Sequence, residues 1–318
     1  GELGFLGMTI SEEWGGAGAD NVSLALVIEE ISAADAACGL LVGLQNSVVC
    51  APINQFGTNE QKERYLRPAA RGEIRGCFCL TEPQAGSDAS NLRTTADLRG
   101  NRYVINGSKQ FISSGASADI ALIFGITDSD SGKKGISAFI VPTDSPGYRV
   151  VAKEDKLGQR ASDTCQLSFE DLEVFPDMVL GELGEGYRIA LANLEGGRIG
   201  IGAQALGIAR AAYEAALSYA KERESMGQAI IQHQAVAFRL ADMATKIEVA
   251  RQMIWHAAAL KDSGRPALKE ACMAKLFASE AAVHAASETM KIFGSFGYST
   301  EFPAERFLRD AHSLRVVE

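Results

Sequence analysis

The chain has 318 residues, 47% of them hydrophobic and 22% charged, which is ordinary for a soluble globular protein and enough for two or three packed units. Lys and Arg number 31 against 40 Asp and Glu, and the net charge of −9 argues against a general binder of nucleic acid or anionic membranes, although local arginines can still hold an anionic ligand. The 6 cysteines and 4 histidines lack disulfide-framework and metal-ligand spacings, so we predict reduced thiols and no metal site.

The first part of the chain, residues 1–75, is predicted to be helical. Apolar or small residues recur near the helical period, and Thr58 or Asn59 is a suitable N-cap for the last of these helices. The expected helices cover 21–35, 40–49 and 57–66.

From about residue 76 the pattern changes to the alternation typical of strands. The pair Asn106-Gly107 is typical of a two-residue hairpin turn, so we predict a hairpin within 103–109. A polar loop is expected over 128–134. A β region of roughly 100 residues has the size of a small barrel or sandwich. Further short strands are expected at 120–125, 136–141, 148–151 and 165–169.

From residue 186 the pattern is helical again, in long alanine-rich runs that favour close packing in a bundle. These runs cover 187–222, 232–263 and 268–293, and a further helical run follows Phe302-Pro303. The sequence therefore predicts an α+β multidomain protein. Its parts are an N-terminal helical domain at 1–75, a central β-barrel-like domain at 76–185 and a C-terminal four-helix bundle at 186–318. The chain begins and ends abruptly, so we expect residues to be missing at both ends.

Two further features bear on the class of protein. No uninterrupted apolar run reaches membrane-spanning length and no signal peptide is recognisable, so we expect no membrane insertion. Gly200–Ala205 matches a loose dinucleotide-binding pattern, but no strand precedes it, so we interpret it as a helix-packing segment.

Three short segments carry possible chemistry. Cys77–Asp88 runs from an apolar strand into a turn with Gly86, Ser87 and Asp88, which suits a phosphate or a heteroaromatic edge but is also an ordinary strand exit. Lys109–Gly115 places an aromatic residue before a hydroxyl, and alone it reads as a strand end. The stretch Leu194–Arg198 is interpreted as the opening of a long helix. Glu195 suits a helix N-terminus, and Arg198 is either a surface residue or an anion contact.

The last residue, Glu318, follows a helical run that contains Arg309-Asp310-Ala311. Acidic residues in such a place are ordinarily solvated surface residues. In a chain without a metal motif or a nucleophile motif, this carboxylate is nevertheless a candidate general base.

Together and in this order, the segments resemble the acyl-CoA dehydrogenase family. Leu80–Asp88 is similar to the family's first signature, and Phe293–Pro303 with Arg309-Asp310-Ala311 is similar to its second. Each motif is short, but they are collinear and span nearly the whole chain. Four shorter segments are also similar to the family pattern: Ser11–Gly18, Gly158–Asp163, Arg223–Gly227 and His233–Phe238.

The resemblance implies an FAD enzyme, usually a homotetramer, with FAD between the β domain and the bundle and its adenosine half held by the neighbouring subunit. The first signature and the triplet Phe111-Ile112-Ser113 would line the flavin, with Ser113 near flavin N5. Arg223, Gln234 and the segment from Lys291 would meet the partner's FAD. The FAD-binding residues implied are Phe78, Leu80, Thr81, Gly86, Ser87, Phe111, Ile112, Ser113, Arg223, Gln234, Lys291 and Gly294; Ser87, Glu195 and Arg198 would lie near the CoA ester.

The same resemblance implies that Glu318, the ninth residue after Arg309, is the catalytic base of the short- and medium-chain branch. Isovaleryl- and long-chain-type relatives place the base just before the arginine matched by Arg198, where this chain has Gly197. Glu318 would take the α-proton of an acyl-CoA while the β-hydrogen leaves as hydride to flavin N5. The product would be a trans-2-enoyl-CoA, with electrons passing to an electron-transfer flavoprotein. Hydrogen bonds to the thioester carbonyl and a raised carboxylate pKa suit this chemistry.

Four positions depart from the family pattern. Lys291 replaces a glutamine, Ser295 a second glycine, Phe111 the commoner tryptophan and Val317 the tyrosine before the base. Lys291 bears on the FAD contact across subunits, and Val317 bears on the shape of the acyl pocket. The resemblance implies a dehydrogenase of acyl-CoA esters with short or short branched acyl chains. Two alternatives stay open: an acyl-CoA oxidase that passes electrons to oxygen, and a protein of the same fold without turnover. The expected location is the bacterial cytoplasm, or the mitochondrial matrix in a eukaryote.

Overall fold

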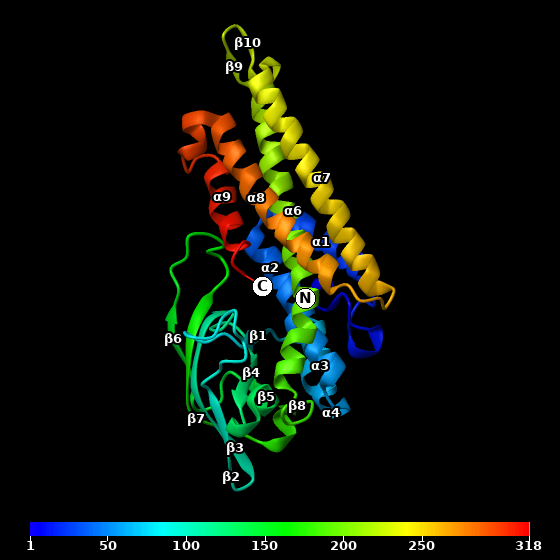
Figure 1. Ribbon diagram of the computed structural model, residues 1–318, viewed down its shortest axis with the longest axis vertical. Helices are drawn as coiled ribbons and strands as arrows, with labels where there is room; N and C mark the ends of the chain where they lie inside the picture. Colours follow the sequence, from blue (N-terminus) through cyan, green and yellow to red (C-terminus); the bar gives the residue numbers. More distant parts are fainter. Residues whose placement is uncertain (318) are drawn as a thin grey trace. The chain divides into compact units, whose positions relative to one another are not determined.

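The computed structural model describes residues 1–317, and the chain folds into two compact units that we treat separately. The first unit comprises Gly1–Ala19, Leu44–Asp155 and Ser162–Gly196, and the second comprises Asp20–Gly43, Lys156–Ala161 and the chain from Gly197 on. The predicted order of N-terminal helices, a central β-sheet domain and C-terminal helices is confirmed (Figure 1). The domain boundaries at 75 and 185 stay a prediction.

An 8-stranded sheet forms the framework of the first unit, in the order β6-β7-β3-β2-β4-β5-β8, with β1 paired to β4. Most pairs are antiparallel, while β1 and β2 run parallel to β4. The strands are β1 Gly76–Cys79, β2 Thr95–Arg99, β3 Arg102–Ser113, β4 Ile120–Ile126, β5 Ile136–Pro142, β6 Tyr148–Lys153, β7 Thr164–Val174 and β8 Val179–Leu180.

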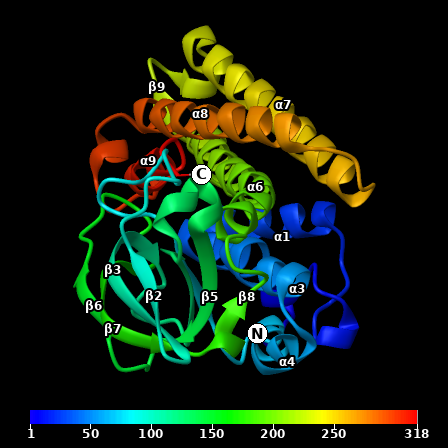
Figure 2. The same ribbon diagram turned by 60° about the horizontal axis from the view of Figure 1, so that its bottom comes forward.

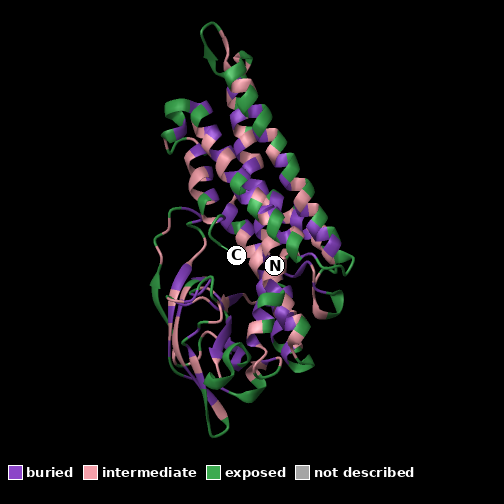
Figure 3. Ribbon diagram, in the orientation of Figure 1, coloured by how far each residue is buried: buried purple, intermediate pink, exposed green. Residues whose placement is uncertain are grey.

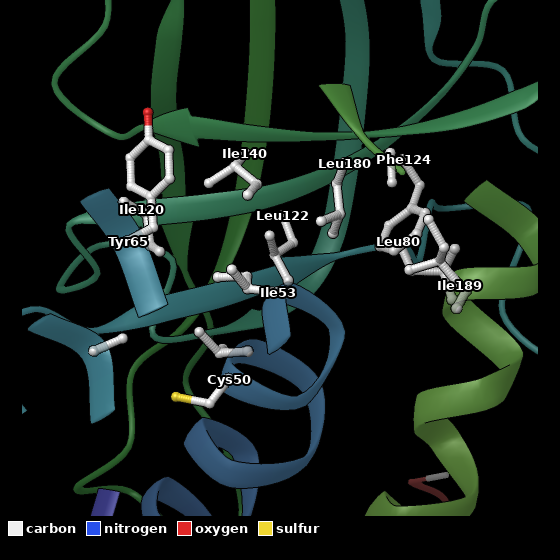
Figure 4. Close-up of a cluster of buried hydrophobic side chains, with 14 of the residues drawn as sticks. Cys50, Ile53, Tyr65, Leu80, Ile120, Leu122, Phe124, Ile140, Leu180 and Ile189 are labelled. Atoms are coloured by element: carbon white, nitrogen blue, oxygen red, sulfur yellow. The ribbon is translucent and has the colours of Figure 1, made fainter. Parts of the chain in front are cut away.

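Strand β4 is apolar on both faces because it lies between two hydrophobic cores. Ile120, Leu122 and Phe124 face one core, which also receives helical residues such as Ile53 and Ile189 (Figure 4). The intervening residues, Ala121 and Ile123, belong to the other core, with residues of β3, β5 and β7. The two-residue period of a strand sends alternate side chains to opposite faces, so a strand covered on both sides reads as a continuous apolar run.

Short helices precede the sheet in the first unit. Thr58 is the N-cap predicted for one of them, and it forms a reciprocal capping box with Gln61. The remaining helical elements of this unit are η1 Phe5–Gly7, η2 Glu12–Trp14, the π-helical η3 Gln45–Cys50, α3 Ala51–Phe56, α4 Asn59–Gln61, the π-helical η4 Lys62–Leu66, α5 Arg67–Ala70, η5 Ser129–Gly135 and η6 Pro176–Met178.

One stretch of helix, Ala36–Phe56, is long and apolar enough to cross a membrane by length and composition alone. Of its most apolar window, 61% is buried inside the protein. Polar residues interrupt the stretch, and buried Gln45 exchanges two hydrogen bonds with the backbone of Gly76 at the start of β1. A core helix passes the same test, so this stretch is weak evidence for a membrane span.

The predicted hairpin turn at Asn106-Gly107 is wrong. Both residues lie inside β3, and the turn is formed by Gly100 and Asn101 between β2 and β3. Gly107 serves a close approach instead, because a Cβ atom there would lie 2.4 Å from Thr94 Oγ1. A register shift between β3 and β7 at this point marks the same irregularity.

Long helices make up the second unit, and Figures 1 and 2 show α7 and α8 side by side. Alanines line the buried face of α8. Buried residues (purple) and exposed residues (green) alternate around this helix in Figure 3. Close packing of α8 on α6 lets Thr289 Oγ1 donate to the Ala212 carbonyl over 2.9 Å. The helices are α1 Asn21–Ala34, α2 Ala36–Leu44, α6 Gly186–Glu222, which belongs to this unit from Gly197 on, α7 Gln234–Asp262, α8 Leu268–Phe293 and α9 Ala304–Ser313. The other elements are η7 Ile230–Gln232, η8 Gly294–Tyr298 and the hairpin of β9 Glu224–Ser225 and β10 Gln228–Ala229.

A buried carboxylate joins three helices of the second unit. Glu29 on α1 lies 3.1 Å from Arg210 Nε on α6 and 3.0 Å from Arg251 Nη2 on α7. A carboxylate removed from water requires such partners, so this cluster fixes how the three helices meet.

Candidate active site

The loop after β1 forms the first part of the candidate site. Glu82 and Ala85 exchange two backbone hydrogen bonds of 3.0 Å, which close a tight turn. Beyond it Gly86, Ser87 and Asp88 are exposed, and within the described residues no partner is found for the backbone N–H groups of Gly86 and Ser87. The sequence expectation of a turn with free donors therefore agrees with this geometry.

A buried ion pair anchors this loop to β3. Lys109 Nζ lies 2.8 Å from Glu82 Oε1 and donates to the Leu80 carbonyl over 3.1 Å, and both side chains are almost completely buried. Glu82 also accepts from the backbone N–H groups of Arg93 and Thr94. Burial acts to raise the pKa of Glu82, but Lys109 and these hydrogen bonds outweigh it, so the pKa is lowered. The sequence motifs assign no role to Glu82 or Lys109, because nothing close to either residue in the chain indicates that the pair is buried.

The end of β3 forms the second part of the candidate site. Phe111 has a positive φ of 57° and is 62% exposed, whereas the next residue, Ile112, is buried. Ser113 is half-buried at the strand end. The bulge between β3 and β7 at this point turns the Phe111 ring outward. A bulky residue at positive φ is strained by about 1–3 kcal/mol, which is typical of functional sites.

The loop and the strand end lie side by side, because Gln110 N–H donates to the Thr81 carbonyl over 2.9 Å. Asp163 supports the same end of β3 by accepting from Ala116 N over 2.9 Å and from Ser117 Oγ over 2.8 Å. By contrast, Phe78 packs into the core, with its ring centroid 4.8 Å from that of Phe124. The first unit thus combines an exposed aromatic ring with free backbone donors and hydroxyls, a donor set that fits a flat heteroaromatic group such as a flavin.

A basic cavity of about 480 Å³ lies in the second unit, at the end of α8 and the start of α7. Lys291 lines it as expected, together with Arg239 and His233. Glu288 holds both cations, with Lys291 Nζ at 2.6 Å and Arg239 in closer contact. Arg223 and Gln234 do not line the cavity. Both are exposed, and in the sequence they lie on either side of the β9–β10 hairpin, which contributes Ser225 and Met226 to the lining. The full lining is Ser225, Met226, Ile230, His233, Ala235, Val236, Arg239, Lys291 and Ile292.

The remaining predicted residues lie on α6 and at the end of α8. Gly294 caps α8 with a positive φ of 63° and is exposed. Glu195 and Arg198 lie one turn apart on α6, both half-buried. The expectation that Glu195 stands near a helix N-terminus is wrong, because α6 begins at Gly186, about two and a half turns earlier.

The proposed base, Glu318, lies outside the described residues. The helix before it, α9, ends at Ser313, and Leu314 beyond it is buried. Val317 is 38% exposed. Among residues 1–317 no group of three or more His, Cys, Asp or Glu side chains has an arrangement that could hold a metal ion.

The comparisons with known proteins cover nearly the whole chain. Models of the acyl-CoA dehydrogenase N-terminal, middle and C-terminal domains match residues 1–73, 77–172 and 184–318. An acyl-CoA dehydrogenase of Bacillus subtilis is 49% identical over 318 residues, which are 100% of this chain and 84% of the relative. The human mitochondrial short-chain specific acyl-CoA dehydrogenase is 46% identical over 100% of this chain and 77% of the relative.

Solved structures agree with the sequence matches. Butyryl-CoA dehydrogenase from Megasphaera elsdenii has a TM-score of 0.97 and 42% identity, over 99% of this chain and 83% of that chain. A chain from a structure described as the electron transferring flavoprotein of Acidaminococcus fermentans has a TM-score of 0.98 and 48% identity, over 99% and 83% of the two chains. The family resemblance read from the motifs is therefore confirmed, and the chain belongs to the acyl-CoA dehydrogenase family of FAD-dependent oxidoreductases.

Proposed function

We propose that this protein oxidises a short-chain acyl-CoA between its α and β carbons and forms a trans-2-enoyl-CoA. The observation that carries the proposal is the likeness over the full chain to proteins named short-chain specific, at 46% identity for the human and 43% for the Clostridium acetobutylicum relative. In this proposal Glu318 is the general base that removes the α-proton. Glu195 and Arg198, one turn apart on α6, contact the CoA ester, with Ser87 of the β1 loop.

The side chains of the first unit would hold the flavin. Phe111 offers a ring face, Thr81 and Ser113 offer hydroxyls, and Gly86 and Ser87 offer backbone donors at the edge of the loop. FAD, when bound, supplies the acceptor for the two electrons that leave with the β-hydrogen. The cations of the basic cavity, Lys291 and Arg239, suit the diphosphate of the partner's FAD. In this proposal Arg223, Gln234 and Gly294 contact the same FAD.

We expect Phe111→Asn to raise the free energy of unfolding of the apoprotein by about 1 kcal/mol, because Asn adopts positive φ more readily than Phe. The same change should weaken FAD binding by about tenfold through loss of ring stacking. Urea unfolding of the apoprotein and FAD titration measure the two effects. Leu98→Asn is a matched control, because Leu98 is also 62% exposed but lies on the neighbouring strand β2. Equal FAD affinities for the two variants would contradict the stacking role.

The electron acceptor distinguishes a dehydrogenase from an oxidase of the same fold. The likeness to a chain from a structure described as an electron transferring flavoprotein supports such a partner. We expect protein reduced by butyryl-CoA to reoxidise slowly in air-saturated buffer and rapidly with added electron-transfer flavoprotein. Stopped-flow absorbance and a peroxide assay measure this. Fast, stoichiometric peroxide formation would instead assign the protein as an oxidase.

We propose a homotetramer in the bacterial cytoplasm or the mitochondrial matrix. Large apolar side chains that a second copy would cover are exposed on α7 and α8, among them Phe238 at 67% and Leu276 at 65%. The similarity to a bacterial relative and to relatives named mitochondrial supports these two locations.

A further inference from the structure

A strained segment of the second unit has no part in the chemistry described so far. Residues 156–161 join β6 to β7 in sequence, yet they group with the helices of the second unit. Within this segment Gly158 and Gln159 are buried, and Gln159 has a positive φ of 49°. Such a conformation is unfavourable for glutamine, so the surrounding contacts must hold it in place.

Those contacts come from α9. Gln159 N–H donates to Asp310 Oδ1 over 2.5 Å, and its side-chain Nε2 donates to Ser313 Oγ over 2.5 Å. On the same helix, Arg309 donates to the Leu157 carbonyl over 3.1 Å. Gln204 of α6 in turn donates to Gln159 Oε1 over 3.1 Å. The segment therefore connects α9 to the longest helix of the chain through a single buried glutamine.

The fit between the segment and α9 is tight. A Cβ atom at Gly158 would lie 2.2 Å from the Arg309 carbonyl oxygen, so only glycine allows the backbone of the segment to approach the helix. Burial raises the pKa of Asp310, and the hydrogen bond from Gln159 and the nearby arginines only partly offset this. A half-buried carboxylate and a strained glutamine both cost stability, and what they provide in return is a fixed position for α9.

We propose that Gln159 and Asp310 are positioning residues that fix the placement of α9, and through it the chain segment that bears the base. The inference rests on the proposed function in one respect, namely that Glu318 follows this helix and acts in the reaction. Neither residue is assigned to touch the substrate. Their effect on the reaction is transmitted along α9 and the short segment after it.

The test uses full-length, FAD-loaded protein and two readouts. Asp310→Ala removes the acceptor for Gln159 N–H. Asp310→Asn keeps an acceptor oxygen, so the hydrogen bond from Gln159 N–H should remain. We expect Asp310→Ala to slow flavin reduction by butyryl-CoA at least tenfold and to speed hydrogen–deuterium exchange of peptides covering 304–317 at least tenfold. Asp310→Asn should stay within about threefold of wild type in both.

Asp262→Ala is the matched control. Asp262 also accepts from backbone N–H groups, those of Asn21 and Val22, but it lies at the end of α7. We expect this variant to stay within about twofold of wild type in both readouts. Equal effects of Asp310→Ala and Asp262→Ala, or no rescue by Asp310→Asn, would overturn the proposal. If Asp310→Ala fails to fold, Gln159→Asn replaces it, because asparagine tolerates positive φ but is too short to reach Ser313.

The two readouts separate this inference from the proposed function. If no acyl-CoA reduces the wild-type flavin, the proposed function fails, while the exchange of 304–317 still decides whether Asp310 holds α9. If wild type is reduced normally and Asp310→Ala matches it in rate and exchange, only the positioning role fails.

Discussion

Replacing Glu318 by glutamine is expected to slow reduction of bound FAD by butyryl-CoA by about 10²–10⁴-fold, the usual contribution of a general base. Glutamine keeps the size of the side chain but cannot accept the α-proton at neutral pH. FAD content and the dissociation constant of the CoA ester should change little, because the loss concerns the transition state only. Anaerobic stopped-flow absorbance of the flavin gives the rate constant.

The control for this experiment is Glu301→Gln, a change of the same kind at an exposed residue of the C-terminal region. It should leave the rate of flavin reduction within about twofold of wild type. If Glu318→Gln reduces its flavin as fast as wild type, another residue is the base. That base would have to come from a place that the motifs do not indicate, because Gly197, at the position expected for the base of isovaleryl- and long-chain-type relatives, has no side chain that can accept a proton.

Replacing Lys109 by methionine should have the largest effect on stability. Removing one partner of a buried ion pair typically costs about 3–5 kcal/mol, because the other charge is left without compensation. Here Glu82 would lose Lys109 at 2.8 Å, and the Leu80 carbonyl would lose its donor. Urea unfolding of the apoprotein measures the free energy change. FAD affinity should fall as well, since the pair anchors the loop that carries Thr81.

Two further variants test this interpretation of the pair. Lys109→Met combined with Glu82→Gln should recover part of the lost stability, because no unpaired charge remains. Arg102 lies on β3, like Lys109, and forms an exposed ion pair with Glu173 on β7. Arg102→Met breaks this pair and should cost less than about 1 kcal/mol. Equal costs for Lys109→Met and Arg102→Met would show that burial of the Lys109–Glu82 pair does not matter.

Local signals in the sequence predicted the local structure well. The Thr58 cap, the long alanine-rich helices and the helical setting of Gly200–Ala205 all depend on residues close together in the chain. The prediction failed where a distant segment decides the conformation. Asn106-Gly107 has the composition of a turn, but β3 continues through it because Thr94 packs against Gly107. The helical run expected from residue 187 agrees with the start of α6 at Gly186, whereas the expectation that Glu195 lies near a helix N-terminus is wrong.

The same holds for the candidate site, where local motifs could be predicted and contacts between distant residues could not. Collinear motifs identified the segments, and the structure brings Thr81 and the residues around Phe111 together through the Gln110 hydrogen bond. Sequence alone could not show the positive φ of Phe111, the burial of Lys109 and Glu82, or the contact of Gln159 with Asp310. Each depends on residues far apart in the chain, and no periodicity records such a contact.

Anaerobic titration of the FAD-loaded protein with a panel of acyl-CoA thioesters, followed by the flavin absorbance, tests the central claim most directly. The panel should include butyryl-, isovaleryl-, hexanoyl- and palmitoyl-CoA. We predict that butyryl-CoA or a short branched thioester bleaches the flavin rapidly and yields the trans-2-enoyl-CoA, while palmitoyl-CoA reacts at least tenfold more slowly. A flavin that stays oxidised with every member of the panel would contradict acyl-CoA dehydrogenation as the function of this protein.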